Sequence, residues 1–283
     1  MQPAWAIYLE SDFRWAIFAP TVPSTPIDPH MDLHLKDKVA LVTGGARGLG
    51  QAICLGLATE GAHVAINYCR ARQRAAALAD RIRATHGGDA IAVQGDVAEA
   101  ENVARIFEQS EHRLGPLDIL VNNAAVWPRA YVREMTEEDW DRTLAVNLKG
   151  AFLTCREAVR RWLAAGRGGR IVNVSSAVAF LGSTTGHAHY AASKAGLVNF
   201  TVSLAREVAA QGIYVNAVAP GMMRTEMALD ALETNQAGYL QRIPLGRIAD
   251  PAEVANTVVF MASDRASYTT GATIDASGGM LMR

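Results

Sequence analysis

Short runs of apolar and β-branched residues alternate along the chain with longer stretches in which polar and apolar positions mix. The short runs predict strands at residues 39–43, 63–67, 90–94, 119–122, 170–175 and 214–219, with a seventh, edge strand at 272–275. The longer stretches predict helices at residues 51–60, 72–86, 99–114, 136–165 and 191–211. Strands and helices that alternate in this way form a mostly parallel sheet covered by helices on both faces. The pattern therefore predicts a doubly wound α/β fold.

A glycine-rich turn follows the first predicted strand. It carries Gly44, Arg47, Gly48 and Gly50, and a helical pattern begins directly after it. Glycines let a backbone turn sharply and approach a pyrophosphate, while the N-terminus of the following helix offers unpaired N–H groups to the anion. The spacing is Gly-x-x-x-Gly-x-Gly, which differs from the general Gly-x-Gly-x-x-Gly fingerprint. Strand, turn and helix together predict a dinucleotide site.

A tyrosine and a lysine lie four residues apart in Tyr190-Ala-Ala-Ser-Lys194, and Ser176 lies upstream at the end of an apolar run. Residues four apart share one helix face. We expect the lysine cation to lower the pKa of the phenol from about 10 towards neutrality. A phenol tuned in this way exchanges protons with a substrate oxygen, which a serine hydroxyl can hold. A chance pair on a solvated helix face is the alternative.

Several motifs together resemble the classical short-chain dehydrogenase/reductases, in that family's order and spacing, over roughly residues 35–283. The matching positions are Thr43, Gly44, Gly48, Gly50, Asn122, Asn123, Ala124, Asn147, Ser176, Tyr190, Lys194, Pro220 and Gly221. The resemblance implies a single Rossmann-type domain, a nicotinamide cofactor, and hydride transfer between a carbonyl and an alcohol.

The resemblance also implies roles for four catalytic residues. Ser176 would hold the carbonyl oxygen, Tyr190 would donate the proton, and Lys194 would keep the tyrosine acidic and bind the nicotinamide ribose. Asn147 would support a water that relays protons to the lysine, although an asparagine there can instead cap or kink its helix. Ser175 is the rival of Ser176.

Further positions would contact the cofactor by the same resemblance. Asp96 would accept from the adenine amino group, or cap a helix, and Met223 and Thr225 would hold the nicotinamide carboxamide. The full predicted cofactor set is Gly44, Arg47, Gly48, Leu49, Gly50, Tyr68, Asp96, Val97, Asn123, Ala124, Tyr190, Lys194, Pro220, Gly221, Met223 and Thr225.

The end of the second predicted strand bears on the choice of cofactor. NAD enzymes place a carboxylate there for the ribose 2′-hydroxyl. Here Asn67, Tyr68, Cys69 and Arg70 provide no acid, and basic residues follow. Arg47 in the glycine turn could reach a 2′-phosphate as a charge-assisted donor. We therefore expect NADP(H), with NAD(H) as the alternative.

Composition and charge exclude some classes of partner. The 283 residues are 50% hydrophobic and carry a net charge of -1, which argues against nucleic acid or an anionic membrane as partner. The three cysteines lack metal spacing and read as free thiols in a reducing, cytoplasmic setting. His187 and His189 lie in one loop without a third ligand cluster, so no metal site is expected.

Residues 1–34 form a predicted N-terminal extension, either a flexible arm or a segment before the natural start at Met31. Residues 35–283 form the predicted domain, with a lid over the substrate at about 222–247. The C-terminal pattern resembles the 3-oxoacyl-[acyl-carrier-protein] reductases, and Arg167 matches a basic residue near their carrier docking surface. Gln211 stands where a second basic residue is usual, which weakens that reading.

The predicted substrate is a hydrophobic keto compound such as a 3-oxoacyl thioester, with acyl carrier protein as a possible partner. A general ketone reductase, an alcohol dehydrogenase or a sugar-alcohol dehydrogenase is the alternative enzyme. An idle NADP-binding redox sensor is the alternative from another class. The family resemblance also implies a homotetramer.

Overall fold

A central sheet of seven parallel strands organises the computed structural model, which describes residues 32–86 and 88–282. The strands are β1 (Val39–Val42), β2 (His63–Tyr68), β3 (Ala90–Gln94), β4 (Ile119–Asn122), β5 (Gly169–Val174), β6 (Ile213–Pro220) and β7 (Thr273–Ala276). Their order is β3-β2-β1-β4-β5-β6-β7, and every neighbouring pair is parallel. The strand order reverses between β1 and β4, and ligands of such sheets bind at that switch point.

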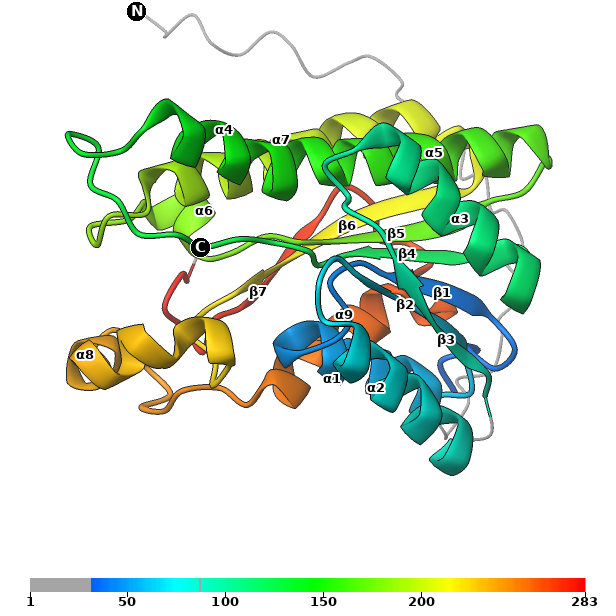
Figure 1. Cartoon of the computed structure of the whole chain (residues 1–283), viewed down its shortest axis with the longest axis horizontal. Coiled ribbons are helices and arrows are strands. Elements are labelled where there is room, and N and C mark those ends of the chain that lie inside the picture. Colours follow the sequence, from blue (N-terminus) through cyan, green and yellow to red (C-terminus); the bar gives the residue numbers. More distant parts are fainter. Residues whose placement is uncertain (1–31, 87, 283) are drawn as a thin grey trace, which may run out of the picture. The chain divides into compact units, whose positions relative to one another are not determined.

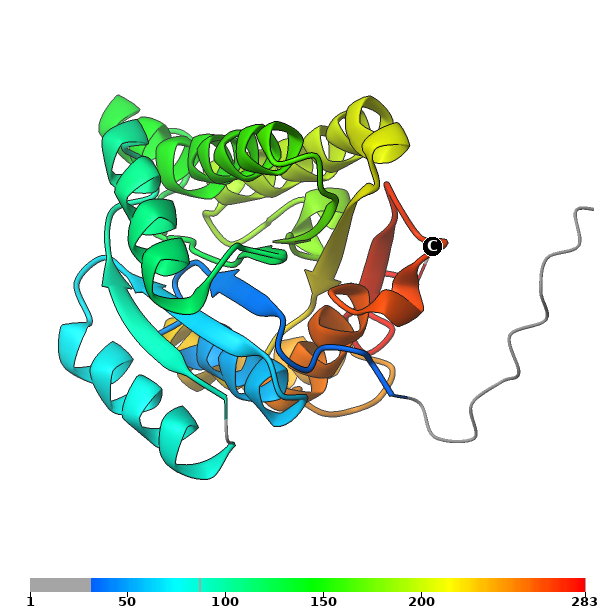
Figure 2. The ribbon, with the colours of Figure 1, turned by 90° about the vertical axis from the view of Figure 1, so that its right-hand side faces the viewer.

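Helices cover both faces of the sheet, as Figures 1 and 2 show. On one face lie α3 (Ala100–Leu114), α4 (Glu137–Leu144), α5 (Gly150–Ala164) and α7 (Ala188–Val208). On the other lie α1 (Gly48–Thr59), α2 (Arg72–Thr85) and α9 (Pro251–Met261). Two further helices, α6 (Val178–Leu181) and α8 (Leu229–Leu240), complete the set of α-helices in the described ranges.

Each face of the sheet has its own hydrophobic core. The first packs α1, α2 and α9 against alternate strand residues such as Val42 and Ile66, and the second packs α3, α5 and α7 against their neighbours, such as Leu41 and Ala65. Successive strand side chains point to opposite faces, so a strand buried on both sides is apolar at most of its positions. This requirement explains why the strands read as continuous apolar runs.

The predicted fold class is confirmed, and the predicted strand bounds lie close to the observed ones. The stretch predicted as one helix at 136–165 is instead divided into α4, a π-helical segment (Ala145–Lys149) and α5. Helix α9 was not predicted, although Asp250 and Glu253 form a capping box at its start.

The N-terminal extension predicted at residues 1–34 lies outside the described residues, apart from 32–34. From Leu33 onward the chain is one compact unit. Within the described ranges, no helix is both long and hydrophobic enough to cross a lipid bilayer.

Candidate active site

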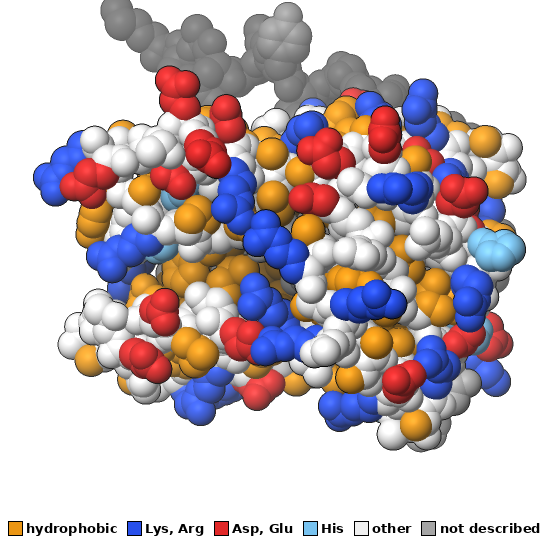
Figure 3. Space-filling model, in the orientation of Figure 1, with side chains coloured by type: hydrophobic (Ala, Val, Ile, Leu, Met, Phe, Trp, Pro, Cys, Tyr) orange, Lys and Arg blue, Asp and Glu red, His pale blue; other side chains and the backbone are white. Residues whose placement is uncertain are grey.

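The predicted site residues gather where the carboxyl ends of β1, β4, β5 and β6 meet. The glycine turn follows β1, Asn123 follows β4, Ser176 follows β5, and Gly221 follows β6. Between the two helical layers the molecule is hollowed on this side, and hydrophobic side chains gather in the hollow (Figure 3). Parallel strands bring these loops together because all of their carboxyl ends lie at one edge.

Helix α7 positions Tyr190 and Lys194 one turn apart, as predicted. The Lys194 ammonium lies 5.7 Å from the centroid of the Tyr190 ring. Its Nζ donates a 2.7 Å hydrogen bond to the carbonyl oxygen of Val174, the last residue of β5. Only 2% of Lys194 is exposed. An ammonium has three donors, so this bond leaves two for other acceptors.

The pKa values of the pair correct one prediction. Although part of Tyr190 remains open to solvent, burial raises its pKa to about 12, and a hydrogen bond from Ser176 lowers it less. Burial also lowers the pKa of Lys194 to about 8. The prediction of a lowered tyrosine pKa is therefore wrong for this structure, because desolvation of the phenol outweighs the hydrogen bond from Ser176. A phenol with a raised pKa keeps its proton at neutral pH, as a proton donor must.

The two adjacent serines have different environments. Ser175 is buried, and its Oγ donates to the backbone oxygen of Lys194 at 3.0 Å. Ser176 is partly exposed and interacts with the Tyr190 phenol. Ser175 thus ties β5 to α7, whereas Ser176 is partly exposed beside the Tyr190 phenol, which favours the predicted choice of Ser176.

Asn147 lies within the π-helical segment and is 1% exposed. Its Oδ1 accepts from the backbone N–H of Val126 at 2.8 Å, and its Nδ2 donates to the Val126 oxygen at 3.0 Å and to Ser193 Oγ at 3.1 Å. Asn147 therefore joins the loop after β4 to α7 beside Tyr190. This positioning role accords with the kinked-helix alternative, and the proton-relay role remains a prediction.

The glycine turn has the geometry that a pyrophosphate requires. Gly44 and Gly48 have φ angles of +62° and +53°, which side chains disfavour. A Cβ on Gly50 would lie 2.3 Å from the Gly44 oxygen. No side chain of the described residues caps the N-terminus of α1, and its first turn holds no acid. The chain therefore fits a dinucleotide here, because the open N–H groups and helix dipole favour an anion.

Thr43 and Asn123 lock this turn to the end of β4. Asn123 Nδ2 donates to the oxygens of Thr43 and Gly44 at 3.0 and 3.1 Å. Thr43 Oγ1 accepts from the backbone N–H groups of Asn123 and Ala124, both at 3.0 Å. The two loops at the switch point are thus rigid with respect to each other.

Three predicted cofactor residues lie at the carboxyl ends of β2 and β3: Tyr68 is the last residue of β2, and Asp96 and Val97 follow β3. Tyr68 and Val97 are buried, at 7% and 5% exposure. Asp96 Oδ1 accepts from the backbone N–H of Ala98 at 3.0 Å, so the turn-forming role of Asp96 is observed. Contact of Asp96 with adenine remains a prediction.

The segment after β6 returns over the glycine turn. A Cβ on Gly221 would lie 2.8 Å from the Ser277 oxygen, and Met223 forms a parallel bridge with Ala249. A Cβ on Gly48 would lie 3.5 Å from Thr225 Cγ2. Thr225 is therefore next to the glycine turn, and its contact with the nicotinamide carboxamide stays a prediction.

An aromatic wall beside Tyr190 was not predicted as a unit. Trp127 stacks on His187 with ring centroids 4.4 Å apart, and lies 6.2 Å from the Tyr190 ring. His187 Nδ1 donates to the Pro128 oxygen at 2.8 Å. The sequence could not pair Trp127 with a histidine so distant along the chain.

His189 is fully buried in α7, and neither of its ring nitrogens has a hydrogen-bond partner in the described part of the chain. Nowhere in that part do three or more potential metal-ligating side chains form a cluster.

A charged cluster at the cofactor end was also missed. Glu226 accepts hydrogen bonds from Arg74 and from Arg47 of the glycine turn. The acid is far from both arginines in sequence, so no local signal could have found it.

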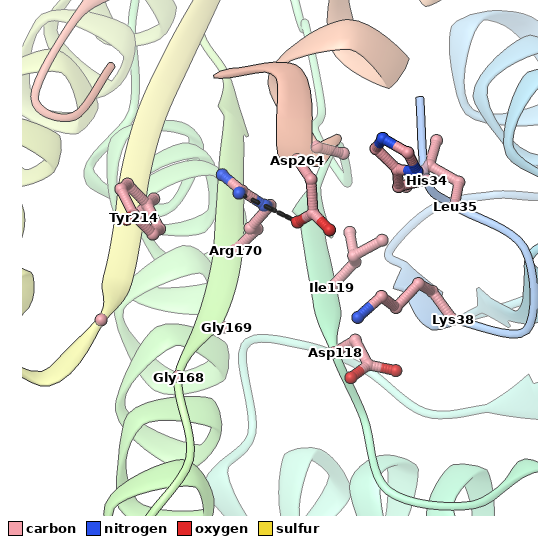
Figure 4. A pocket seen from close by; sticks show the side chains of 12 residues that line it. His34, Leu35, Lys38, Asp118, Ile119, Gly168, Gly169, Arg170, Tyr214 and Asp264 are labelled. Atoms are coloured by element: carbon pink, nitrogen blue, oxygen red, sulfur yellow. Dashed lines mark hydrogen bonds and ion pairs between the residues drawn. The ribbon is translucent and has the colours of Figure 1, made fainter. Parts of the chain in front are cut away.

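A cavity of about 180 Å³ lies at the opposite, amino ends of the strands. There Arg170 donates to Asp264 at 3.0 Å, and its guanidinium lies 4.6 Å from the Tyr214 ring (Figure 4). Arg167, the predicted carrier-docking residue, pairs with Asp118 at this same end. Both arginines are paired with carboxylates of this chain, so the structure favours a stabilising role for them over the binding of a partner.

Comparison with known proteins agrees with this geometry. Residues 44–281 match the family model described as enoyl-(acyl carrier protein) reductase. The chain is 44% identical over 246 residues to the 3-oxoacyl-[acyl-carrier-protein] reductase FabG of Staphylococcus aureus strain Mu50, covering 87% of this chain and 98% of the relative.

Two solved structures are also similar. A putative gluconate dehydrogenase from Agrobacterium tumefaciens superposes with a TM-score of 0.84 at 35% identity, covering 90% of this chain and 100% of that one. A putative short-chain alcohol dehydrogenase from Sinorhizobium meliloti 1021 superposes with a TM-score of 0.83 at 39% identity, covering 88% and 98%. The chain belongs to the short-chain dehydrogenase/reductase family, and is an oxidoreductase of CH–OH and C=O groups that uses a nicotinamide cofactor.

Proposed function

We propose that the protein is an NADP(H)-dependent reductase of 3-oxoacyl thioesters or similar hydrophobic keto compounds. The observation that carries this proposal is a partly exposed phenol with Ser176 beside it and a buried ammonium one helical turn away. The name of the Staphylococcus aureus relative supports the choice of substrate class.

Tyr190 acts as the proton donor in this mechanism. A nicotinamide cofactor bound at the glycine turn would supply the hydride for the carbonyl carbon. Ser176 Oγ donates a hydrogen bond to the carbonyl oxygen and orients it towards the phenol. Because the pKa of Tyr190 is raised to about 12, Oη carries a proton at neutral pH and delivers it as negative charge develops on that oxygen.

Lys194 provides positive charge beside the phenolate that Tyr190 becomes. The Val174 carbonyl holds Nζ at 2.7 Å, which fixes the ammonium below the ring. Its remaining N–H donors would hold the ribose hydroxyls of the nicotinamide nucleotide. Asn147 holds the loop after β4 and Ser193 in place, so it positions the α7 pair.

The preference for NADP(H) rests on two arginines. Arg47 lies in the glycine turn, and Arg74 lies at the start of α2. Arg47→Ala should weaken NADPH binding about 10- to 100-fold and leave NADH binding within about twofold, because one charge-assisted bond to phosphate contributes about 1.5–3 kcal/mol. Titration calorimetry with both cofactors measures this difference. A wild-type preference for NADH would overturn the cofactor assignment.

The hydrophobic substrate class rests on Trp127 beside Tyr190 and on a lid that we place at residues 222–247, which contains α8. Arg167 is paired with Asp118 at the far end of the sheet, which does not favour carrier-protein docking on this chain. A small acyl thioester is therefore the first substrate to test. A ketone or sugar-alcohol dehydrogenase is the second candidate, favoured by the names of the two solved relatives.

An NADPH-oxidation assay across substrates separates these functions. Acetoacetyl-coenzyme A and ethyl acetoacetate should be reduced with a kcat/KM at least tenfold above those of simple ketones, and gluconate should not be oxidised at a comparable rate. A reversed ranking would favour the dehydrogenase alternative. No turnover with any carbonyl or alcohol would favour the redox sensor.

A further inference from the structure

Two arginines beside the cofactor groove bind one carboxylate from a distant segment. Arg74 Nη1 donates to both carboxylate oxygens of Glu226, at 2.5 and 2.7 Å. Arg47 Nη1 donates to the same carboxylate at 3.3 Å. Arg47 belongs to the glycine turn, Arg74 to α2, and Glu226 opens the 3-10 helix Glu226–Ala228 that leads into α8. One carboxylate therefore bridges three separate segments.

The bridge lies beside the glycine turn, where the proposed NADP(H) site would hold the adenosine. Arg47 is the N-cap residue of α1, whose open N–H groups suit a pyrophosphate. Thr225, the neighbour of Glu226, lies close to Gly48 of the same turn. The lid thus starts beside the glycine turn, and Glu226 extends from it to the arginines.

The bridge is weak enough to be displaced. The side chains of Arg47, Arg74 and Glu226 are 56%, 55% and 46% exposed. Exposed ion pairs contribute only about 0.2–1 kcal/mol each. A phosphate carries about −1.5 to −2 charges and three acceptor oxygens, so it competes well with a single carboxylate. Both anions cannot share the two guanidinium groups without repulsion.

We propose that Glu226 is an intramolecular competitor for the 2′-phosphate and a residue that sets cofactor specificity. The inference rests on the proposed NADP(H) site. A cofactor with a 2′-phosphate displaces Glu226 and unties the start of the lid from the arginines. A cofactor without that phosphate leaves the bridge in place. Glu226 therefore reduces the affinity for NADP(H) below what the two arginines alone would give.

Titration calorimetry on the full chain tests this competition with matched ligands. The ligands 2′,5′-ADP and 5′-AMP differ only in the 2′-phosphate, and NADPH and NADH differ in the same way. Glu226→Gln should increase the affinity for 2′,5′-ADP and NADPH about threefold to tenfold, which corresponds to the two lost ion pairs. The affinities for 5′-AMP and NADH should stay within about twofold of the wild-type values.

Two further variants serve as controls. Glu60→Gln removes the same charge at the far end of α1, where Glu60 is exposed, and should change no affinity by more than about twofold. In an Arg74→Ala background, Glu226→Gln should increase the affinity for 2′,5′-ADP by at most about twofold. The reason is that Arg74, which binds both carboxylate oxygens of Glu226, is then absent.

The outcomes separate the competition from the cofactor assignment. Weaker or unchanged binding of 2′,5′-ADP by Glu226→Gln would overturn the competition, as would equal tightening of all four ligands. If the wild-type chain prefers NADH but Glu226→Gln gains affinity only for the 2′-phosphate ligands, the competition holds and the NADP(H) assignment fails.

Discussion

Two buried cations lie at opposite ends of strand β5, and the chain holds them in different ways. At the amino end, Arg170 pairs with Asp264 and stacks on Tyr214. At the carboxyl end, the Lys194 ammonium is bonded to the Val174 carbonyl and lies near the Tyr190 ring. A carboxylate balances the first charge, whereas a neutral carbonyl and a phenol accompany the second.

The difference has a physical consequence. A paired cation keeps its charge and stabilises the fold, whereas a cation without a carboxylate is costly to bury. This cost appears as the lowered pKa of Lys194, about 8. Perturbed pKa values of this kind mark functional sites. We therefore expect the carboxyl end of β5 to serve chemistry and the amino end to serve stability.

Removal of the phenolic hydroxyl should have the largest effect. Tyr190→Phe takes away the proton donor but keeps the ring, and general acid catalysis contributes about 10²–10⁴ in rate. We expect kcat for acetoacetyl-coenzyme A to fall by at least about 100-fold, with NADPH affinity nearly unchanged in calorimetry. Retention of a tenth of the wild-type kcat would exclude Tyr190 as the acid.

The adjacent serines should separate chemistry from packing. Ser176→Ala removes a donor to the substrate oxygen, and kcat should fall about 10- to 100-fold at an unchanged melting temperature. Ser175→Ala removes a buried hydrogen bond to the Lys194 carbonyl, and should lower stability by about 1 kcal/mol with a smaller loss of activity. Steady-state assays and urea unfolding measure both effects. A larger kcat loss for Ser175→Ala would reverse the assignment.

The pH dependence of reduction should follow Lys194. Its pKa of about 8 means that the ammonium is present below pH 8 and is lost as the pH rises. The neighbouring Tyr190, with a pKa of about 12, stays protonated throughout this range. Reductive kcat/KM should therefore be level below pH 8 and fall about tenfold per unit above it. Lys194→Arg should remove this decline, because guanidinium stays charged.

Much of the fold could be predicted because buried parallel strands must be apolar on both faces. The Tyr190–Lys194 contact could also be predicted, since a spacing of four fixes it within one helix. A kink at Asn147 could be predicted only as an alternative, because the helical pattern continues through the π-helical segment that divides α4 from α5.

The direction of the tyrosine pKa shift could not be predicted from the sequence either. Spacing shows which charges are near, but the cost of burial depends on the whole packed environment. The bridge from Glu226 to Arg47 and Arg74 depends on tertiary structure alone, since its members are 179 and 152 residues apart.

The direct test compares two variants, Lys194→Met at the carboxyl end of β5 and Arg170→Met at its amino end. For each variant, urea unfolding at pH 7 gives the stability and steady-state assays give kcat/KM. At pH 7 Lys194 is charged in both the folded and the unfolded state. Because its pKa is lower in the folded state, the charge lowers the free energy of unfolding at this pH. This destabilisation disappears as the pH rises from about 8 towards 10.5. Lys194→Met should therefore keep or raise the free energy of unfolding, by up to about 1–3 kcal/mol, while activity falls by at least about 100-fold. Arg170→Met should lower the free energy of unfolding by about 1–2 kcal/mol and leave kcat/KM within about twofold. Loss of stability in Lys194→Met together with loss of activity in Arg170→Met would contradict the account.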